Sequence, residues 1–243
     1  MTGVRSAWCI AERARAGHGA HNAQPPREVS TLPRIALIHA VAVAVAPVAD
    51  AFARLWPEAK LQNLLDDTLS ADLARDGKIT PAMADRFIAL TRYAEDTGAD
   101  AILFTCSAFG PCIEAAASQT SIPVLKPNEA MFREAAGMGR RLGLLASFAP
   151  SLEPMTREFA DLSQAELTTA CAPEAMDALR AGDGTGHDQR LAEAAAGMIG
   201  CEAIMLAQFS TARARDAVAE ATGKSVLTSP DSAVRALRIL LDC

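Results

Sequence analysis

Short apolar runs alternate with longer stretches of helical spacing from residue 34 onward. Eight of these runs have the length of β-strands and are rich in Leu, Ile, Val and Ala. They cover residues 34–40, 59–65, 101–106, 123–126, 141–147, 166–171, 203–208 and 225–228. Because strands and helices alternate, we expect an α/β fold in which helices cover both faces of a parallel sheet.

The helix predicted over residues 80–98 has the clearest ends. Thr80 suits the N-cap, Pro81 suits the first helical turn, and Gly98 follows the last periodic residue. The other helices are expected between the strands, with less sharply marked boundaries.

The sequence contains one unit twice. Residues 98–108 read GADAILFTCSA and residues 200–210 read GCEAIMLAQFS, and an offset of 102 aligns them without a gap. An offset of 107 places RIALIHA, from residue 34, over RLGLLAS, from residue 141. Four strands thus map onto the other four in order, which predicts two lobes with parallel sheets, related by a pseudo-twofold duplication. In such folds the active site lies in the cleft between the lobes, at the carboxyl ends of the strands.

The predicted domain boundaries follow from the repeat. Lobe 1 covers residues 34–129 and is completed by a C-terminal helix over 229–243, while lobe 2 covers 130–228. Residues 1–33 lack a hydrophobic period and are expected to form a flexible N-terminal extension. Its candidate metal ligands, Cys9, His18 and His21, are expected to have no specific role.

Composition and charge narrow the class of protein. The longest apolar run, AVAVAVAPVADAFA, is broken by Pro47 and Asp50 and is too short to span a bilayer. The net charge of −6, without long runs of one sign, argues against nucleic-acid and membrane partners. Six cysteines without CxxC pairs indicate free thiols in a cytoplasmic protein and no metal site.

Polar residues gather where the predicted strands end. They are His39, Asp66, Asp67, Cys106, Ser107, Lys126, Ser147, Cys171, Gln208, Ser210 and Thr228. Cys201 instead begins a strand and lies roughly 20 Å from Gln208, so it cannot act with Cys106.

Cys106 is the strongest candidate for chemistry. It ends an apolar strand and precedes small residues that begin a helix. The positive end of a helix dipole lowers the pKa of a thiol, and the same amides bind carboxylates. The alternative is a buried structural cysteine.

The segment GADAILFTCSAF, followed by SIPVLKP, resembles the first catalytic segment of the aspartate/glutamate racemase superfamily. This superfamily includes hydantoin racemase, maleate isomerase and arylmalonate decarboxylase, and GCEAIMLAQFS resembles its second catalytic segment. The resemblance implies two Rossmann-like lobes and cofactor-independent proton transfer next to a carboxylate. The implied substrate is a small carboxylic or dicarboxylic acid.

Only the first catalytic cysteine of that pattern is present. Cys106 matches it, whereas Gln208, which has no usable pKa, occupies the second position. Inversion of a planar intermediate needs an acid on the far face, so racemisation would require a second base that the sequence does not identify, and it ranks after one-sided transfer. One-sided proton transfer, as in an isomerase or decarboxylase, is the first hypothesis, although the decarboxylases keep the cysteine of the second lobe. The alternatives are Cys106 as a covalent nucleophile, maleate isomerase-like or hydrolytic, and a non-catalytic carboxylate-binding homologue.

Several residues carry two interpretations. His39 either pairs with Cys106 or a substrate oxygen, or is satisfied by backbone groups. Gln208 either orients the substrate or caps the strand and helix around it. Lys126 binds a second carboxylate or points to solvent, and Asp66 binds a polar group or caps a helix.

The remaining predicted substrate contacts adjoin these residues. The resemblance implies a carboxylate grip by Ser107, Ser147 and Ser210, and Ala108, Phe148 and Phe209 complete the predicted binding set. No cofactor is expected, the partner is a small carboxylate, and a homodimer or higher homo-oligomer is left open.

Overall fold

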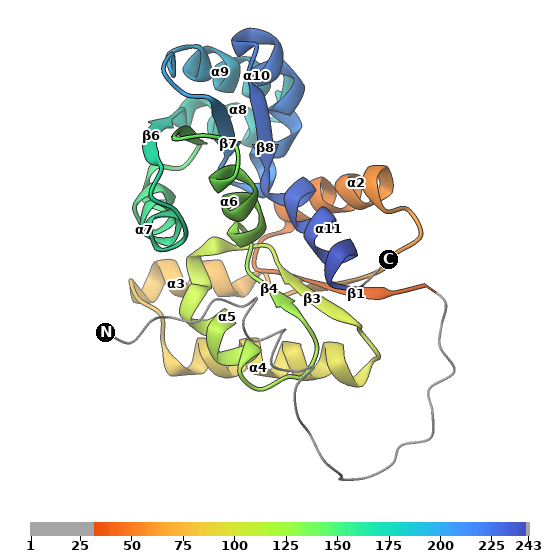
Figure 1. Ribbon diagram of the computed structural model, residues 1–243. Helices are drawn as coiled ribbons and strands as arrows, with labels where there is room; N and C mark the ends of the chain where they lie inside the picture. Colours follow the sequence, from red (N-terminus) through yellow and green to blue (C-terminus); the bar gives the residue numbers. More distant parts are fainter. Residues whose placement is uncertain (1–31, 242–243) are drawn as a thin grey trace. The chain divides into compact units, whose positions relative to one another are not determined.

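The computed structural model describes residues 32–241 of the chain. The predicted extension over 1–33, with Cys9, His18 and His21, lies almost wholly outside the described residues. Within them, all eight predicted strands are present, and they form two parallel four-stranded sheets (Figure 1). No helix in this part of the chain combines the length and the apolar character that a bilayer crossing requires.

The two sheets belong to two compact units, which confirms the expected two-lobed α/β fold class. Unit 1 contains the described residues up to Val45, then Trp56–Lys126, and the chain from Leu237. Unit 2 contains Ala46–Leu55 and Pro127–Ala236. This division differs from the expected one for residues 46–55, 127–129 and 229–236. Within unit 2, Arg54 pairs with Asp231 at 2.7 Å, an interaction between segments far apart in the sequence.

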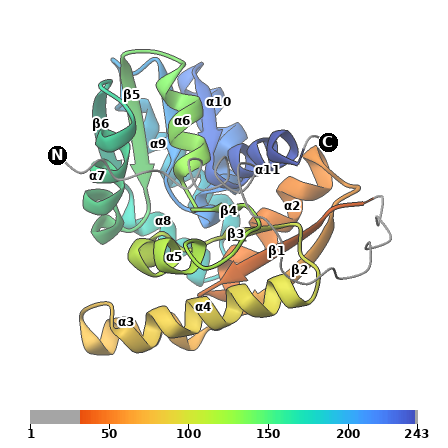
Figure 2. The ribbon, with the colours of Figure 1, turned by 60° about the horizontal axis from the view of Figure 1, so that its bottom comes forward.

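Unit 1 has the strand order β2-β1-β3-β4. Its strands are β1 (Arg34–His39), β2 (Lys60–Leu65), β3 (Ala101–Phe104) and β4 (Val124–Leu125). Its helices are α3 (Thr68–Asp76), α4 (Pro81–Asp96) and α5 (Gly110–Ala117), with a 3₁₀ turn η2 (Ser107–Phe109) before α5 and another, η1 (Ala42–Ala44), after β1. Figure 2 shows α3 and α4 running along one side of this sheet.

The core of unit 1 joins α4 and α5 to one face of the sheet. The ring of Phe87 on α4 lies 5.2 Å from that of Phe104 and 5.1 Å from that of Phe109, measured between centroids. The helix prediction is confirmed at both ends, because Thr80 accepts a hydrogen bond from the Met83 amide and Gly98 has a φ of 86°.

Unit 2 repeats the arrangement with the order β6-β5-β7-β8. Its strands are β5 (Arg141–Ala146), β6 (Glu166–Cys171), β7 (Ala203–Leu206) and β8 (Ser225–Thr228). Its helical segments are α6 (Glu129–Ala136), η3 (Ala149–Ser151), α7 (Leu152–Leu162), α8 (Pro173–Arg180), α9 (Gly184–Ala196), η4 (Phe209–Ala214) and α10 (Arg215–Thr222). Two helices cross the division between the units, α2 (Val45–Leu55) and α11 (Ser229–Leu240).

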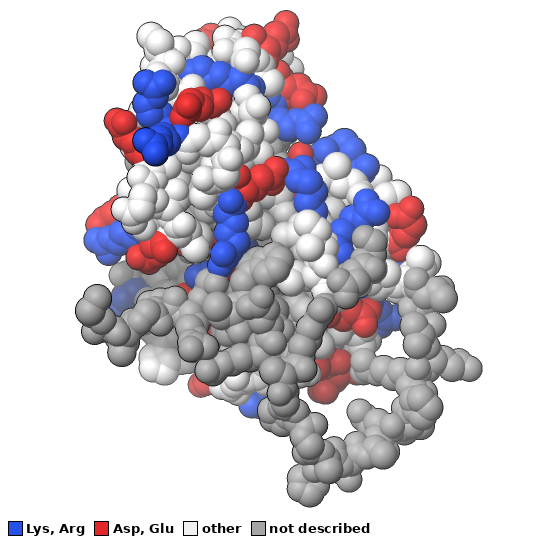
Figure 3. All heavy atoms as spheres, viewed as in Figure 1, with Lys and Arg blue, Asp and Glu red and all other residues white. Residues whose placement is uncertain are grey.

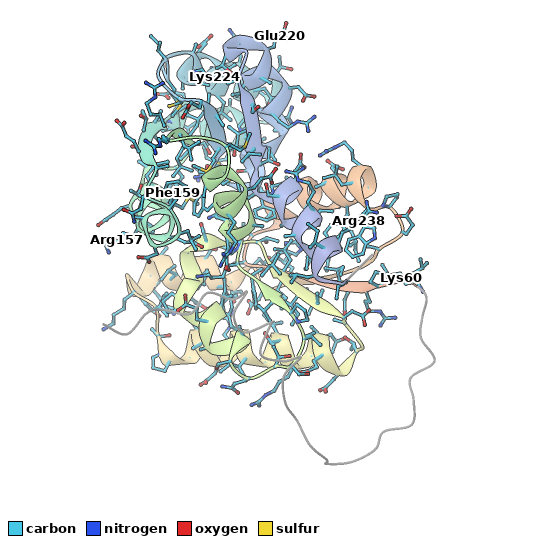
Figure 4. All side chains as sticks on the ribbon, in the orientation of Figure 1. Lys60, Arg157, Phe159, Glu220, Lys224 and Arg238 are labelled. Atoms are coloured by element: carbon cyan, nitrogen blue, oxygen red, sulfur yellow. The ribbon has the colours of Figure 1, made fainter. Side chains whose placement is uncertain are left out.

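Both faces of the unit 2 sheet are covered, and alternate residues of β5 point to different cores. Leu144 packs with Phe159 of α7, whereas Leu145 packs with Leu191 of α9 and Val218 of α10. Figure 4 labels two residues of α7, the buried Phe159 and the exposed Arg157. A parallel sheet that is covered on both faces explains why its central strands, β5 and β7, read as nearly continuous apolar runs.

An acidic residue secures the start of the sheet in each unit. The Asp100 carboxylate accepts a hydrogen bond from the Arg34 backbone amide at 2.8 Å. At the repeated position, Glu202 Oε2 accepts from the backbone amides of Arg140 at 2.6 Å and Arg141 at 2.9 Å. The repeated acid is therefore structural, and it lies at the amino ends of the strands, away from the candidate site.

Replacing Glu202 with Gln should lower the resistance of unit 2 to urea at pH 7. The two backbone hydrogen bonds hold the pKa of Glu202 below its ordinary 4.5, so the carboxylate stabilises the fold fully above that value. This contribution is lost as the pH falls through the lowered pKa, so the difference between variant and wild type should shrink in acid. Urea unfolding at several pH values measures it.

Glu220→Gln is the matched control, since Glu220 is an exposed residue of α10 in the same unit (Figure 4). Equal midpoints for Glu202→Gln and Glu220→Gln at pH 7 would show that the acid does not secure the strand ends.

Candidate functional site

Cys106 lies at the carboxyl end of the unit 1 sheet, two residues after β3. It is the N-cap residue of η2, with φ −125° and ψ 116°, and α5 follows at Gly110. The thiol is free and partly exposed. Ser107 is partly exposed and Ala108 is exposed, so a small ligand can reach the first residues of this turn.

Burial controls the ionisation of this thiol. It raises the pKa of Cys106 above the ordinary 9.0, and a backbone hydrogen bond from Ala108 opposes the rise without cancelling it. The predicted lowering by the helix start is therefore wrong. The physical reason is that desolvation of the thiolate outweighs one amide donor, since a short 3₁₀ turn separates Cys106 from α5.

His39, at the end of β1, is fully buried and engaged by two side chains. Its Nδ1 lies 2.9 Å from Thr105 Oγ1, and its Nε2 lies 3.0 Å from Asn63 Oδ1. Both ring nitrogens are thus occupied, and the expected pairing with Cys106 is not what the structure shows. The alternative of a satisfied histidine holds, with side-chain partners in place of the expected backbone partners.

The hydrogen bonds of His39 define its tautomer. Burial lowers the pKa of His39, with the Asn63 bond opposing, so the ring is neutral near pH 7. Asn63 Oδ1 only accepts, so Nε2 carries the proton and Nδ1 accepts the hydroxyl proton of Thr105.

Gln208, at the position repeated from Cys106, holds two loops of unit 2 together. Its Oε1 accepts hydrogen bonds from the Ser147 backbone amide at 3.0 Å and from Ser147 Oγ at 3.4 Å. Its Nε2 donates to Ser151 Oγ at 2.8 Å, and the residue also forms a capping box with Thr211. These bonds are of the kind that the capping interpretation describes, and the substrate-orienting role of Gln208 stays a prediction.

The other predicted substrate contacts in unit 2 are partly solvent-exposed and partly buried. Phe148 is 50% exposed, whereas Phe209 is 3%, Ser210 8% and Ser147 1% exposed. Since Ser147 also gives its amide and hydroxyl to Gln208, it does not present free donors in this structure. Of this set, Phe148 is the residue open to a ligand.

The two predicted charged contacts in unit 1 are engaged in ion pairs. Arg86 Nε donates to Asp66 Oδ2 at 2.8 Å, and Thr68 donates to Asp66 Oδ1 at 2.9 Å. Burial raises the pKa of Asp66, but the bonds from Arg86 and Thr68 outweigh it and bring the pKa below its ordinary value. Lys126 Nζ lies 3.1 Å from Glu114 Oε1, so its ammonium does not simply point to solvent.

Sequence reasoning missed three residues that support the candidate site, namely Asn63, Thr105 and Ser151. Thr105 could have been found from strand pairing, because it lies beside His39 once Ile38 is paired with Phe104.

Among residues 32–241, no three His, Cys, Asp or Glu side chains are grouped to hold a metal ion. Over the face of unit 2 seen in Figure 3, cationic and anionic side chains are intermixed.

Solved structures of similar fold include racemases and racemase homologues. An aspartate racemase homologue from Pyrococcus horikoshii OT3 superposes with a TM-score of 0.68 at 14% identity, over 87% of this chain and 100% of that one. An allantoin racemase from Pseudomonas fluorescens gives 0.65 at 16% identity, over 86% and 91%. A glutamate racemase from Thermus thermophilus, in complex with β-chloro-D-alanine, gives 0.63 at 21% identity, over 87% and 81%. At these identities the likeness establishes the fold.

The duplicated parallel α/β units define a racemase-fold protein. The family model described as Asp/Glu/Hydantoin racemase matches residues 70–237, more than half of the chain. The chain therefore belongs to the Asp/Glu/Hydantoin racemase family, a family of racemases and related enzymes. No curated protein matches it in a sequence search.

Alkylation of Cys106 by iodoacetamide should follow an apparent pKa above 9.0, because burial disfavours the thiolate. Peptide mass spectrometry across a pH series isolates the Cys106 signal from that of the other cysteines. An apparent pKa well below 9.0 would show that the helix start governs the thiol after all.

Replacing Gln208 with Ala should destabilise unit 2 by about 1–3 kcal/mol, because the Ser147 amide loses its acceptor. Urea unfolding gives the free energy of unfolding. Gln189→Ala is the control, since the Gln189 side chain donates to Glu193 within α9 at an exposed position, and it should change stability by less than about 0.5 kcal/mol. Similar losses for both variants would contradict the linking role of Gln208.

Proposed function

We propose that this chain is an isomerase or lyase that transfers a proton through Cys106 to the carbon next to a carboxylate. The proposed substrate is a small carboxylic or dicarboxylic acid, and no cofactor takes part. Family membership supports an enzyme of this broad kind. The observation that carries the proposal is the partly exposed Cys106 thiol at a strand end, with its raised pKa.

A thiol with a raised pKa is protonated near neutral pH, so it begins the reaction as an acid. Loss of CO₂ from the substrate leaves the electron pair of the broken C–C bond on the carbon next to the remaining carboxylate, as an enediolate. The S–H bond of Cys106 breaks, its proton forms the new C–H bond, and the sulfur keeps the electron pair as thiolate. The Ala108 amide donates to that sulfur, and a proton from water restores the thiol.

The proposed transfer is one-sided, because the sequence has glutamine at the position repeated from Cys106. The Gln208 amide has no transferable proton near neutral pH, and it is bonded to Ser147 and Ser151. A second acid at the repeated position is therefore missing, and the proton should arrive on one face of the intermediate. This favours decarboxylation or isomerisation over two-base racemisation.

Substrate binding is proposed at the open positions of the predicted set. The Ser107 hydroxyl and the exposed backbone at Ala108 offer donors for the carboxylate at the start of η2. In unit 2, Phe148 is half exposed and is the open member of the predicted set. We assign no direct contact to His39, Ser147 or Phe209, which are buried in their own units.

A second candidate function is a non-catalytic carboxylate-binding homologue. The raised pKa of Cys106 favours it over the covalent alternative, because a nucleophile must be present as thiolate. A binder would hold a carboxylate and catalyse no exchange of its α-proton.

Replacing Cys106 with Ala should lower turnover by about 10²–10⁴-fold, the usual contribution of a positioned general acid. Proton–deuterium exchange and CO₂ release, followed by NMR over a panel of α-substituted carboxylates and malonates, identify the substrate first. Circular dichroism and urea unfolding check that the variant is folded.

Cys171→Ala is the matched control, since Cys171 is also a free, partly exposed cysteine at a strand end, that of β6. It should retain wild-type turnover. Near wild-type turnover by Cys106→Ala would reject the thiol as acid, and a stable substrate adduct on Cys106 by mass spectrometry would support the covalent route instead. Binding of a panel carboxylate without any turnover would support the binder.

A further inference from the structure

We infer that His39 and Thr105 form a buried positioning pair that directs the Cys106 thiol from the opposite face of the unit 1 sheet. The inference rests on the proposed function, because it explains how the reacting group is held. Neither His39 nor Thr105 contacts the substrate.

The pair is buried and closely bonded. His39 is 0% exposed and Thr105 is 5% exposed, and their side chains meet at 2.9 Å. Asn63, from the neighbouring strand β2, bonds the far side of the imidazole at 3.0 Å. Three side chains, one from β1, one from β2 and one directly after β3, thus form one chain of hydrogen bonds that ends immediately before Cys106.

Strand alternation places this pair on the other face of the sheet from the thiol. Ile38 and Phe104 belong to the core beneath α4 and α5, and Cys106 packs against the same core. Successive side chains of a strand point to opposite faces, so His39 and Thr105 point away from that core. His39 can therefore act on Cys106 only through Thr105 and the backbone that follows it.

The duplication supplies an internal comparison. The offset of 107 places His39 on Ala146, and the offset of 102 places Thr105 and Cys106 on Ala207 and Gln208. The backbone bond is the same in both units: the Thr105 amide donates to the Ile38 carbonyl at 3.1 Å, and the Ala207 amide to the Leu145 carbonyl at 2.9 Å.

The fold at this strand end therefore needs neither the imidazole nor the hydroxyl. Burying polar groups is costly unless they are bonded to each other, and two alanines avoid that cost in unit 2. The polar pair is present in unit 1, where Cys106 follows it. Two alanines replace the pair in unit 2, where Gln208 occupies the position of Cys106. This coincidence points to a role connected with Cys106.

The pair adds a side-chain bond to the residue that precedes the thiol. Without it, Thr105 would be held through its backbone and through a weaker hydroxyl contact with the Ile38 carbonyl at 3.4 Å. The direction of the Cys106 side chain, and with it the bond from the Ala108 amide to sulfur, depends on the backbone at residues 105 and 106. A small rotation there would misplace the reacting proton.

Thr105→Val tests the pair, because it removes the hydroxyl and keeps the shape. We expect kcat to fall by about 10- to 100-fold with KM nearly unchanged, the usual effect of a misplaced reacting group. We also expect the alkylation pKa of Cys106 with iodoacetamide to rise, since the thiolate loses its amide donor. Thr105→Ser, which keeps the hydroxyl, should recover most of both changes.

Thr91→Val is the matched control, because Thr91 is a buried threonine of α4 in the same unit and its hydroxyl has no partner among the described residues. It should leave kcat and the alkylation pKa unchanged. If Thr105→Val does not fold, the double variant His39→Ala with Thr105→Ala replaces it, since unit 2 folds with alanine at both repeated positions.

Wild-type kcat and alkylation pKa in folded Thr105→Val, or in the double variant, would overturn the inference. The alkylation measurement needs no substrate, so it judges the positioning pair even if Cys106→Ala keeps full turnover. Full turnover by Cys106→Ala would reject the proposed function. The alkylation pKa of Cys106 in Thr105→Val would still show whether Thr105 positions the thiol.

Discussion

The parallel register between β1 and β3 is the constraint on which the candidate site depends. Ile38 pairs with Phe104, so Thr105 lies beside His39 and Cys106 follows on the opposite face. A slip of one residue would exchange the faces, burying the thiol against the other side of the sheet and separating the imidazole from the hydroxyl. The Asp100 carboxylate helps to hold this register. It directly precedes β3 and accepts a hydrogen bond from the backbone amide of Arg34, the first residue of β1.

Duplication has kept the backbone of the two units and changed the chemistry at their strand ends. Strand order, pairing and the acid before the third strand are shared. The repeat also keeps a buried carboxylate after the last strand of each sheet, Glu129 paired with Arg133 and Asp231 paired with Arg54 and Arg215. These shared features fix the path of the backbone in each unit. A reactive group at a strand end depends on only a few side chains, which can change while the backbone stays the same. One unit could therefore retain a thiol while the other used the same place to tie two loops together.

Much of the fold could be predicted from the sequence because its signals are local. The central strands are apolar runs of limited length, and the N-cap of α4 is a threonine followed by proline. The repeat made the order of the strands visible twice. The division into units was less predictable, because the placement of residues 46–55 depends on contacts such as that of Arg54 with Asp231, 177 residues apart.

The candidate site was predictable in position and less so in chemistry. Strand ends are local features, so the positions of Cys106 and Gln208 at the ends of β3 and β7 follow from the sequence. The partners of His39 depend on pairing across three strands, and the sequence alone left that residue with two interpretations. Likewise, the pKa of Cys106 depends on how deeply neighbouring elements bury the thiol. The helix dipole inferred from adjacent residues carries no information about this burial.

The raised pKa of Cys106 bears on which proton transfer the site can perform well. A thiolate that must first remove a proton from carbon has to be formed at a cost, and burial increases that cost. A neutral thiol that only gives its proton to a carbanion starts in its stable form, and the charge moves from the substrate to a sulfur beside the Ala108 amide. Reactions in which another event creates the carbanion, such as loss of CO₂, need just this one transfer. A protonated thiol in unit 1, with glutamine at the repeated position of unit 2, therefore suits the proposed delivery of one proton better than an exchange of protons between two faces.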